Sequence, residues 1–174
     1  IAGHVLTNGG WPLIVAEAGI NHNGKLSKAF EMIRVAKAAG ADVVKFQTFK
    51  AEEFVSDGKI PFTYRSQGKN ITEPMLDMFK RHEFSDKEWS LIKEKCDETE
   101  ILFLSTPQNR SDLDLLLKLG VSAIKVGSDD FTNIQLLRDY AMTGLPLILS
   151  CGLADLGEIE ETLKAIGSLK NYPT

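Results

Sequence analysis

The sequence has little cysteine. Its 174 residues include only Cys96 and Cys151, which lack the spacing of a metal site or of a disulfide framework. We therefore expect two free thiols in a reducing compartment, with the cytoplasm as the default location. No base stands beside Cys151 in the sequence, so we expect a small buried residue there rather than a nucleophile.

Long apolar runs and an excess of basic charge are also missing. No apolar stretch approaches the roughly 18 residues of a membrane span, and no charged-then-apolar leader precedes Trp11. Lysine and arginine number 20 against 24 aspartates and glutamates, a formal net charge of −4. This balance argues against a nucleic-acid surface. We expect neither a membrane nor a nucleic acid as partner. The net charge does not exclude a small anionic ligand that binds to a few nearby lysines.

One unit, a strand followed by a helix, repeats along the chain. With 43% apolar and 25% charged residues, the chain suits one globular domain with a sizeable core. The predicted strands cover residues 13–16, 42–46, 101–105, 123–126 and 146–150. The predicted helices cover residues 26–39, 86–99, 110–119, 134–143 and 157–168, and residues 50–85 are predicted to form a long loop.

Polar residues follow every predicted strand. Two α/β folds share the repeated unit: the open doubly wound sheet, and the (β/α)8 TIM barrel, which needs about 200 residues or more. The polar clusters are Glu17 to Asn23, Lys45 with Gln47, Ser105 with Thr106, Lys125 with 128–130, and Ser150 with Gly152. A doubly wound sheet usually uses one or two strand ends for its ligand, whereas a barrel uses several. We therefore predict a barrel of which this chain supplies the first five β/α units.

Two lysines in apolar strands point to an anionic ligand. Lys45 and Lys125 would be costly to bury unpaired, so each needs an anion, and neighbouring hydroxyls suit phosphate and carboxylate oxygens. Glu17 could simply form a structural ion pair with one lysine, which leaves room for a ligand at the other. His22 stands alone, so a hydrogen-bonding role in its turn is expected rather than a metal.

The predicted long loop carries four aromatic residues. They are Phe49, Phe54, Phe62 and Tyr64. Such residues are more often packing residues than a ligand cage, and we expect packing here.

Five motifs at the five strand ends resemble a known family. EAGINHNG at 17–24, KFQ at 45–47, STP at 105–107, KVGS at 125–128 and SCG at 150–152 are similar to the N-terminal barrel of the sialic acid synthases, which include the pseudaminic and legionaminic acid synthases. The resemblance spans residues 13 to 165. It implies that the remaining barrel strands and a small C-terminal domain lie outside this chain, which alone would be inactive.

The resemblance implies a condensation of phosphoenolpyruvate with the open-chain aldehyde of an N-acylated hexosamine such as N-acetylmannosamine. The product is a nonulosonic acid, and phosphate leaves. It also implies a divalent metal, manganese or magnesium, that polarises the aldehyde. The metal ligands would lie beyond residue 174, so no metal ligand is expected in this chain. The complete enzyme is expected to be a homodimer.

The same resemblance assigns the phosphoenolpyruvate contacts. Lys125, Ser128 and Ser150 match positions that hold the phosphate. Lys45 and Thr106 match positions near the carboxylate.

The remaining matched positions concern the chemistry and the sugar. Glu17 matches a glutamate beside the reacting carbons, so it is the expected catalytic residue, and Gln47 matches a sugar-contacting amide. Asp130 matches a position, usually Glu, that binds sugar hydroxyls, and it falls in a turn that reads GSDD where GSGE-like sequences are common. Asn70, in the predicted loop, matches a sugar contact through a gapped alignment.

Two other kinds of protein stay compatible with the sequence. One is a non-catalytic binding module, or an inactive remnant, that keeps only the residues on the phosphoenolpyruvate side of the site. The other is a related synthase that joins phosphoenolpyruvate to an aldose phosphate, for which further basic residues would be expected.

Overall fold

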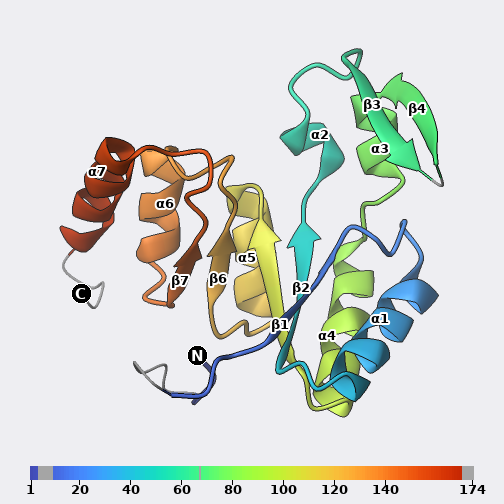
Figure 1. The fold of residues 1–174 in the computed structure, drawn as a ribbon, viewed down its shortest axis with the longest axis horizontal. Helices are drawn as coiled ribbons and strands as arrows, with labels where there is room; N and C mark the ends of the chain where they lie inside the picture. Colours follow the sequence, from blue (N-terminus) through green and yellow to red (C-terminus); the bar gives the residue numbers. More distant parts are fainter. Residues whose placement is uncertain (4–9, 67, 170–174) are drawn as a thin grey trace.

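Strands and helices alternate along the chain, as the sequence predicts (Figure 1). The computed structural model describes residues 1–3, 10–66 and 68–169, and within these ranges no helix is long and apolar enough to cross a bilayer. The strands are β1 (Val15–Gly19), β2 (Val43–Thr48), β3 (Pro61–Ser66), β4 (Lys69–Pro74), β5 (Leu102–Pro107), β6 (Ile124–Val126) and β7 (Leu147–Leu149). The helices are α1 (Leu26–Ala38), α2 (Ala51–Phe54), α3 (Met75–Lys80), α4 (Asp86–Glu98), α5 (Arg110–Lys118), α6 (Ile134–Ala141) and α7 (Leu156–Gly167).

The predicted strands form a parallel array in chain order. β1, β2 and β5 make one parallel sheet, β6 and β7 make a parallel pair, and β6 lies beside β5 (Figure 1). The helix α1 packs on α4, and α6 packs on α7. Each parallel strand is thus followed by a helix that returns the chain to the next strand.

Alternation along the strands separates a helix-covered face from an inner face. On β2, Val44 and Phe46 belong to the core formed with α1 and α4, while Ile124 and Val126 of β6 belong to the core formed with α6 and α7. Lys45 lies between the first two residues and Lys125 between the last two. Both lysines point to the opposite side of the sheet, because successive side chains of a strand alternate. Helices on one face of the sheet are typical of a barrel, whereas a doubly wound sheet has them on both.

The inner face changes from apolar to polar along the strands. Val43, Leu104 and Ala123 form a small buried cluster at one level. Two residues further along β2 and β6, on the same face, come Lys45 and Lys125. The inner face therefore has an apolar floor and a polar upper level at the carboxyl ends of the strands.

The predicted helices are confirmed to within a residue or two at each end. Two of them begin at capping boxes: Ser85 with Glu88 starts α4, and Asp155 with Glu158 starts α7. The first strand is displaced, since β1 begins at Val15 and continues to Gly19. The predicted strand thus stopped before Glu17, which belongs to the strand itself.

The prediction of a long loop at residues 50–85 is wrong. The segment holds α2, an antiparallel hairpin of β3 and β4, and α3, and we call residues 51–80 the hairpin insert. Half-buried Phe62 and Tyr64 alternate with exposed Thr63 and Arg65, the period-2 pattern of a strand covered on one face. The insert stands beyond the carboxyl end of β2 (Figure 1), which places its inner side near the strand ends.

One carboxylate and one glycine anchor the hairpin insert. Glu73 accepts hydrogen bonds from both terminal nitrogens of Arg81, at 2.6 and 2.5 Å, and from the Tyr64 hydroxyl at 2.7 Å. Gly24 has a φ of +66°, and a Cβ there would lie 1.9 Å from the Arg81 carbonyl oxygen. Only glycine allows this approach, so the loop after β1 and the end of the insert fit closely together.

Candidate functional site

The carboxyl ends of the strands enclose a cavity of about 290 Å³, which we call the strand-end pocket. It lies at the polar level of the inner face. Its lining residues are Glu17, Lys45, Gln47, Thr106, Gln108, Lys125, Gly127, Ser128, Asp129 and Ser150. Seven of the nine predicted site residues are in this list, so residues from all five strand ends converge on one cavity.

Strand register explains the convergence. Glu17 of β1 pairs in register with Lys45 of β2, and Gln47 pairs with Thr106 of β5. Partners in a parallel sheet point to the same face, and parallel strands end at the same edge. Residues far apart in the sequence are therefore neighbours in the pocket.

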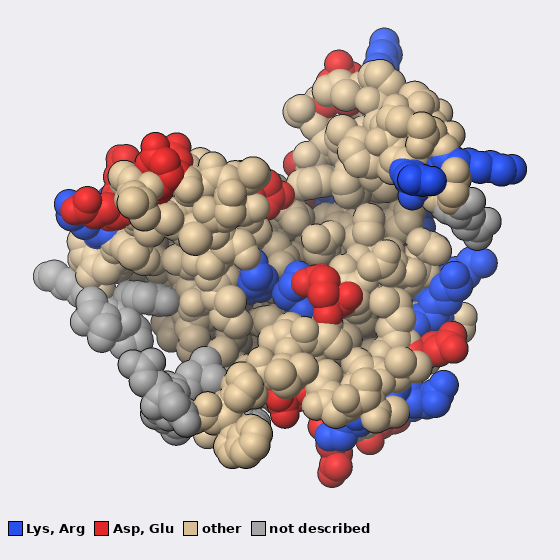
Figure 2. Space-filling view, viewed as in Figure 1, with Lys and Arg blue, Asp and Glu red and all other residues tan. Residues whose placement is uncertain are grey.

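Lys45 and Glu17 form an ion pair across the strands. The Lys45 ammonium lies 2.7 Å from Glu17 Oε2, and the two side chains are 9% and 56% exposed. Basic and acidic side chains lie together near the middle of the molecular face in Figure 2. This contact agrees with Glu17 as a structural partner of Lys45. The Glu17 carboxylate is still open to the pocket, so Glu17 could also take part in the reaction.

Lys125 is the second cation of the pocket. Its ammonium donates hydrogen bonds to the Val126 carbonyl oxygen and, at 2.6 Å, to Ser150 Oγ. Burial lowers the pKa of Lys125, and the charge of Lys45 lowers it further, while Glu17 acts in the opposite direction. Asp129 acts in the same direction as Glu17. Because the nearby charge of Lys45 disfavours the charged form of Lys125, an anion bound between the two lysines would stabilise that form.

Two predicted site residues lie off this pocket. Asn70 is exposed on β4, opposite Arg65 in the hairpin. Asp130 is half-buried, and burial followed by the charge of Asp129 raises its pKa. The expectation that Cys151 is buried is wrong, because its side chain is exposed.

Three lining residues are not among the predicted site residues: Gln108, Gly127 and Asp129. Gly127 lies inside the KVGS motif, and Asp129 lies in the polar cluster at 128–130. Gln108 directly follows the STP motif, so extending that motif by one residue would have found it.

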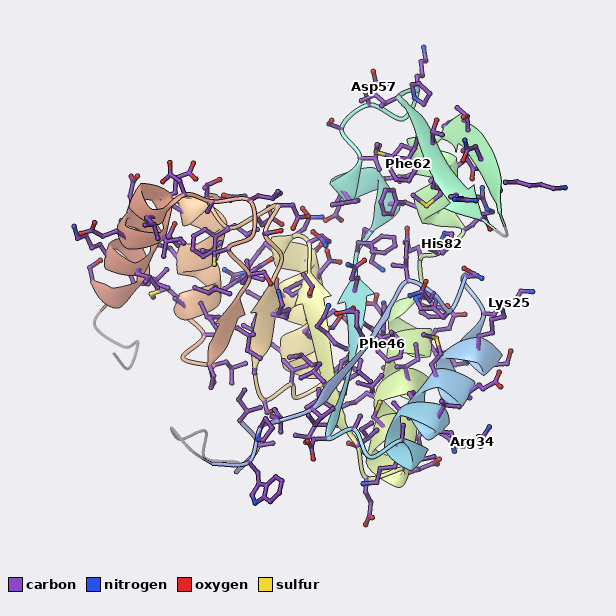
Figure 3. The ribbon with its side chains drawn as sticks, viewed as in Figure 1. Lys25, Arg34, Phe46, Asp57, Phe62 and His82 are labelled. Carbon is purple, nitrogen blue, oxygen red and sulfur yellow. The ribbon has the colours of Figure 1, made fainter. Side chains whose placement is uncertain are left out.

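A second cavity, of about 440 Å³, adjoins the first, and we call it the aromatic pocket. Phe49, Phe54, Phe62, Tyr64 and Phe79 line it, together with polar residues of the loop after β1. Gln47, Gln108 and Asp129 line both cavities. In Figure 3, Phe62 lies within the hairpin insert, and His82 lies between it and the strands.

The aromatic residues pack on one another, as expected, and they also form a cavity wall. The Phe79 ring centroid lies 5.3 Å from that of Phe49 and 4.8 Å from that of Phe54, both edge-on. Packing and ligand contact are therefore not exclusive alternatives for these residues.

His22 has the predicted role in its turn. Its Nδ1 accepts a hydrogen bond from the Gly24 N–H at 3.1 Å, and its ring stacks on Phe84 at 4.3 Å. Burial, assisted by the nearby charge of His82, lowers the pKa of His22 to about 4. A neutral ring that supports the turn accounts for this residue.

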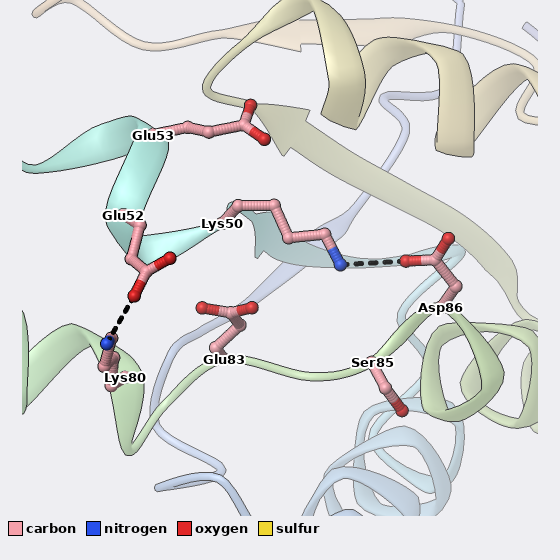
Figure 4. Close-up of a pocket in the computed structure, with 7 residues that line it drawn as sticks. All are labelled: Lys50, Glu52, Glu53, Lys80, Glu83, Ser85 and Asp86. Carbon is pink, nitrogen blue, oxygen red and sulfur yellow. Dashed lines mark hydrogen bonds and ion pairs between the residues drawn. The ribbon is translucent and has the colours of Figure 1, made fainter.

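A larger cavity, of about 680 Å³, lies at α2, α3 and the start of α4 (Figure 4). Its acidic lining residues Glu52, Glu53, Glu83 and Asp86 outnumber its lysines, Lys50 and Lys80. The lysines are also engaged, Lys50 with Asp86 at 2.9 Å and Lys80 with Glu52 at 2.6 Å. This groove is a poor place for a phosphorylated anion, and the strand-end pocket remains the better candidate.

The residues present do not make a metal site. Within residues 1–3, 10–66 and 68–169, no group of three or more His, Cys, Asp or Glu side chains could hold a metal ion. The divalent metal implied by the resemblance stays a prediction for the complete protein.

The family model for NeuB matches residues 32–172. The chain belongs to the NeuB family. It is 41% identical over 157 residues to an N,N'-diacetyllegionaminic acid synthase of Campylobacter jejuni, covering 88% of this chain and 46% of that protein. It is 35% identical over 162 residues to the N-acetylneuraminate-9-phosphate synthase of Homo sapiens, covering 90% and 43%. The chain thus spans less than half the length of these relatives.

Solved structures support the barrel. An N-acetylneuraminic acid synthetase of Leptospira borgpetersenii superposes with a TM-score of 0.78 at 36% identity, covering 89% of this chain and 50% of that one. A truncated 3-deoxy-D-arabino-heptulosonate 7-phosphate synthase of Thermotoga maritima superposes at 0.61 with 13% identity, covering 89% and 47%, a likeness of fold alone. The chain is part of a TIM-barrel-type α/β fold.

Proposed function

We propose that the complete protein condenses phosphoenolpyruvate with the aldehyde of an N-acylated hexosamine to form a nonulosonic acid, and that this chain holds the phosphoenolpyruvate. The observation that supports this most directly is that Lys45 and Lys125 lie in one pocket, where Glu17 forms an ion pair with Lys45 and Lys125 contacts a hydroxyl. Two cations and several hydroxyls suit a ligand that carries a phosphate at one end and a carboxylate at the other.

The residues divide between the two ends of phosphoenolpyruvate. Lys125, with Ser128 and Ser150, holds the phosphate, and Lys125 already donates to the Ser150 hydroxyl at 2.6 Å. Lys45 and Thr106 hold the carboxylate. The carbon atoms of the ligand then lie between β2 and β6, within reach of Glu17 through its pairing with Lys45.

The reaction forms one carbon–carbon bond. Carbon 3 of phosphoenolpyruvate attacks the aldehyde carbon, and the aldehyde oxygen gains a proton. Water adds at carbon 2, and the bond from carbon 2 to the phosphate oxygen breaks, releasing phosphate. Glu17 orients the reacting groups or carries a proton, since its carboxylate is half exposed beside them, while Gln47 contacts the sugar.

The relatives' names describe two kinds of product, one diacetylated and one phosphorylated. Both are formed by synthases of this family, so the class of reaction is shared while the acceptor differs. The remaining barrel strands, a C-terminal domain and a homodimer belong to the proposal for the complete protein. So does a cytoplasmic location, which the two free thiols support.

The test is a condensation assay on the complete protein. It is incubated with phosphoenolpyruvate, N-acetylmannosamine and manganese or magnesium, and we expect phosphate release in step with a nonulosonic acid of the matching mass. Phosphate release without a new carbon–carbon bond would contradict the synthase. An inactive phosphoenolpyruvate-binding module would bind the ligand, seen by calorimetry, and release no phosphate with any aldehyde.

A further inference from the structure

The strand-end pocket is balanced in charge before any ligand binds. Its charged lining residues are two lysines, Lys45 and Lys125, and two carboxylates, Glu17 and Asp129. Phosphoenolpyruvate brings a carboxylate and a phosphate, so the occupied pocket becomes negative. A site shaped only for the tightest binding of such an anion would carry the lysines without a second carboxylate.

The two carboxylates of this pocket are placed differently. Glu17 forms an ion pair with Lys45, in which Glu17 Oε2 lies 2.7 Å from the ammonium. Asp129 lies instead in the turn that follows β6, the strand that carries Lys125. The Lys125 ammonium donates to a backbone carbonyl oxygen and to the Ser150 hydroxyl. Lys125 is therefore hydrogen-bonded to neutral groups, and Asp129 acts on its charge through space.

Gly127 makes room for the Asp129 carboxylate beside the end of β6. A Cβ on Gly127 would lie 2.1 Å from Asp129 Oδ1 and 3.2 Å from its Cγ. Any larger side chain at this position would push the carboxylate elsewhere. With glycine there, the carboxylate lies back against the backbone just after the strand, where Asp129 lines the pocket.

The charge of Asp129 reaches Lys125. Burial lowers the pKa of Lys125, and the charge of Lys45 lowers it further, whereas Glu17 and Asp129 both raise it. The field that favours the Lys125 ammonium opposes a phosphate placed beside it, because like charges repel. Asp129 is exposed, so water and salt weaken this repulsion, and its effect on binding is moderate.

We infer that Asp129 is an affinity-determining residue of the phosphoenolpyruvate site, whose carboxylate partly neutralises Lys125 in the free protein and opposes the phosphate when it binds. The inference rests on the proposed function, which places the phosphate at Lys125. Phosphoenolpyruvate and the phosphate released from it are then both held more weakly than by the two lysines alone. Tighter uniform binding would lower the Michaelis constant without raising turnover, and tightly held phosphate would delay the next cycle.

The experiment measures the dissociation constants of phosphoenolpyruvate and of inorganic phosphate for the complete protein by calorimetry. Asp129→Asn keeps the shape of the side chain and removes its charge. We expect both constants to fall about threefold or more, the scale of an interaction between exposed charges. Asp129→Gly, which gives the turn the glycine of GSGE-like sequences, is a second uncharged variant and should act in the same direction.

Two further variants serve as controls. Asp129→Glu keeps the charge and should leave both dissociation constants close to those of the wild type. Glu161→Gln removes one negative charge from an exposed position of α7 and should change neither constant. An equal gain in affinity from Glu161→Gln and Asp129→Asn would mean that net charge alone is responsible, and it would contradict the inference.

Salt separates an effect of charge from an effect of shape. Between about 0.01 M and about 1 M salt the Debye length falls from about 30 to about 3 Å, so the advantage of Asp129→Asn over the wild type should largely disappear. An advantage that persists at high salt, or unchanged or weaker binding of both ligands by Asp129→Asn, would overturn the inference and leave the synthase intact. Failure of the wild-type protein to bind phosphoenolpyruvate would overturn the proposed function instead.

Discussion

The two adjoining pockets are built in different ways. The strand-end pocket takes its walls from the carboxyl ends of parallel strands, and its residues Lys45 and Glu17 form an ion pair across two of these strands. The aromatic pocket takes seven of its 15 lining residues from the hairpin insert, which the Glu73–Arg81 pair and the fit at Gly24 hold near the strands. Changes at the strand ends should therefore alter the chemistry, and changes at the insert should alter the affinity for the sugar, which Gln47 contacts where the two pockets meet.

The largest expected effect is that of Glu17→Gln. If Glu17 takes part in the reaction, turnover should fall about a hundredfold or more, the scale of a positioned acid or base, with little change in the thermal midpoint. Turnover and thermal midpoint are measured together on the complete protein at saturating metal and substrates. Glu94→Gln, exposed on α4, is the control. Near-normal turnover with a lowered midpoint would leave Glu17 as a structural partner of Lys45.

Lys125→Ala should weaken phosphoenolpyruvate and not the sugar. It removes a charge-assisted contact of about 1.5–3 kcal/mol, or roughly ten- to a hundredfold in affinity. The Michaelis constants for both substrates are compared with those of Lys87→Ala, an exposed lysine of α4. A rise confined to the sugar constant would remove Lys125 from the phosphate.

Gly24→Ala should disturb the aromatic pocket more than the strand-end pocket. An alanine at positive φ costs about 1–3 kcal/mol, and here its Cβ must also displace the Arg81 carbonyl oxygen. Gly40→Ala is the matched control, because Gly40 has a φ of +85° with nothing within 4 Å of an added Cβ. We expect a greater loss of thermal stability at Gly24 and a several-fold rise in the acceptor constant only there. The same loss in both variants would mean that the contact with Arg81 contributes little.

The smallest expected effect is on the pH dependence of the free energy of unfolding, and it concerns Asp112, a buried residue of α5. Burial raises the pKa of Asp112 to about 7, and neither of its carboxyl oxygens has a hydrogen-bond partner among the described residues. The nearby backbone N–H groups of Gln108 and Asn109 partly oppose this shift without reaching hydrogen-bond geometry. The folded protein thus holds a proton that the unfolded chain releases, so this group makes the free energy of unfolding fall as pH rises from about 4 to 7.

Asp112→Asn should remove that decline. His22, whose pKa is lowered to about 4, acts oppositely and makes the free energy of unfolding rise between about pH 4 and 6.5. We expect the variant to gain stability near pH 7 and to show the His22 rise more clearly, in denaturant unfolding of the complete protein at several pH values. Asp114→Asn, exposed on the same helix, is the control. An unchanged pH profile would mean that Asp112 is ionised in the folded protein.

The hairpin insert shows where sequence reasoning failed. Its strands are short, and its sequence alone predicts a loop in which Phe62 and Tyr64 are packing residues. The signal was present in their alternation with Thr63 and Arg65, and in Gly68 before β4, a glycine that adopts a positive φ in the structure. A two-stranded hairpin gains little from its own pairing, and here both of its strands also contact α3 of the same insert.

The sequence by itself determined the alternation of strands and helices, the barrel class and the strand-end residues, because side-chain periodicity and the polar ends of buried strands are local patterns. Only the tertiary structure decided that Lys45 pairs with Glu17, that Lys125 donates to Ser150, and that the hairpin insert closes a second cavity beside them. Strand register and the approach of Gly24 to Arg81 bring together residues that are distant in the chain. Those contacts depend on how elements pack, which no single segment of sequence encodes.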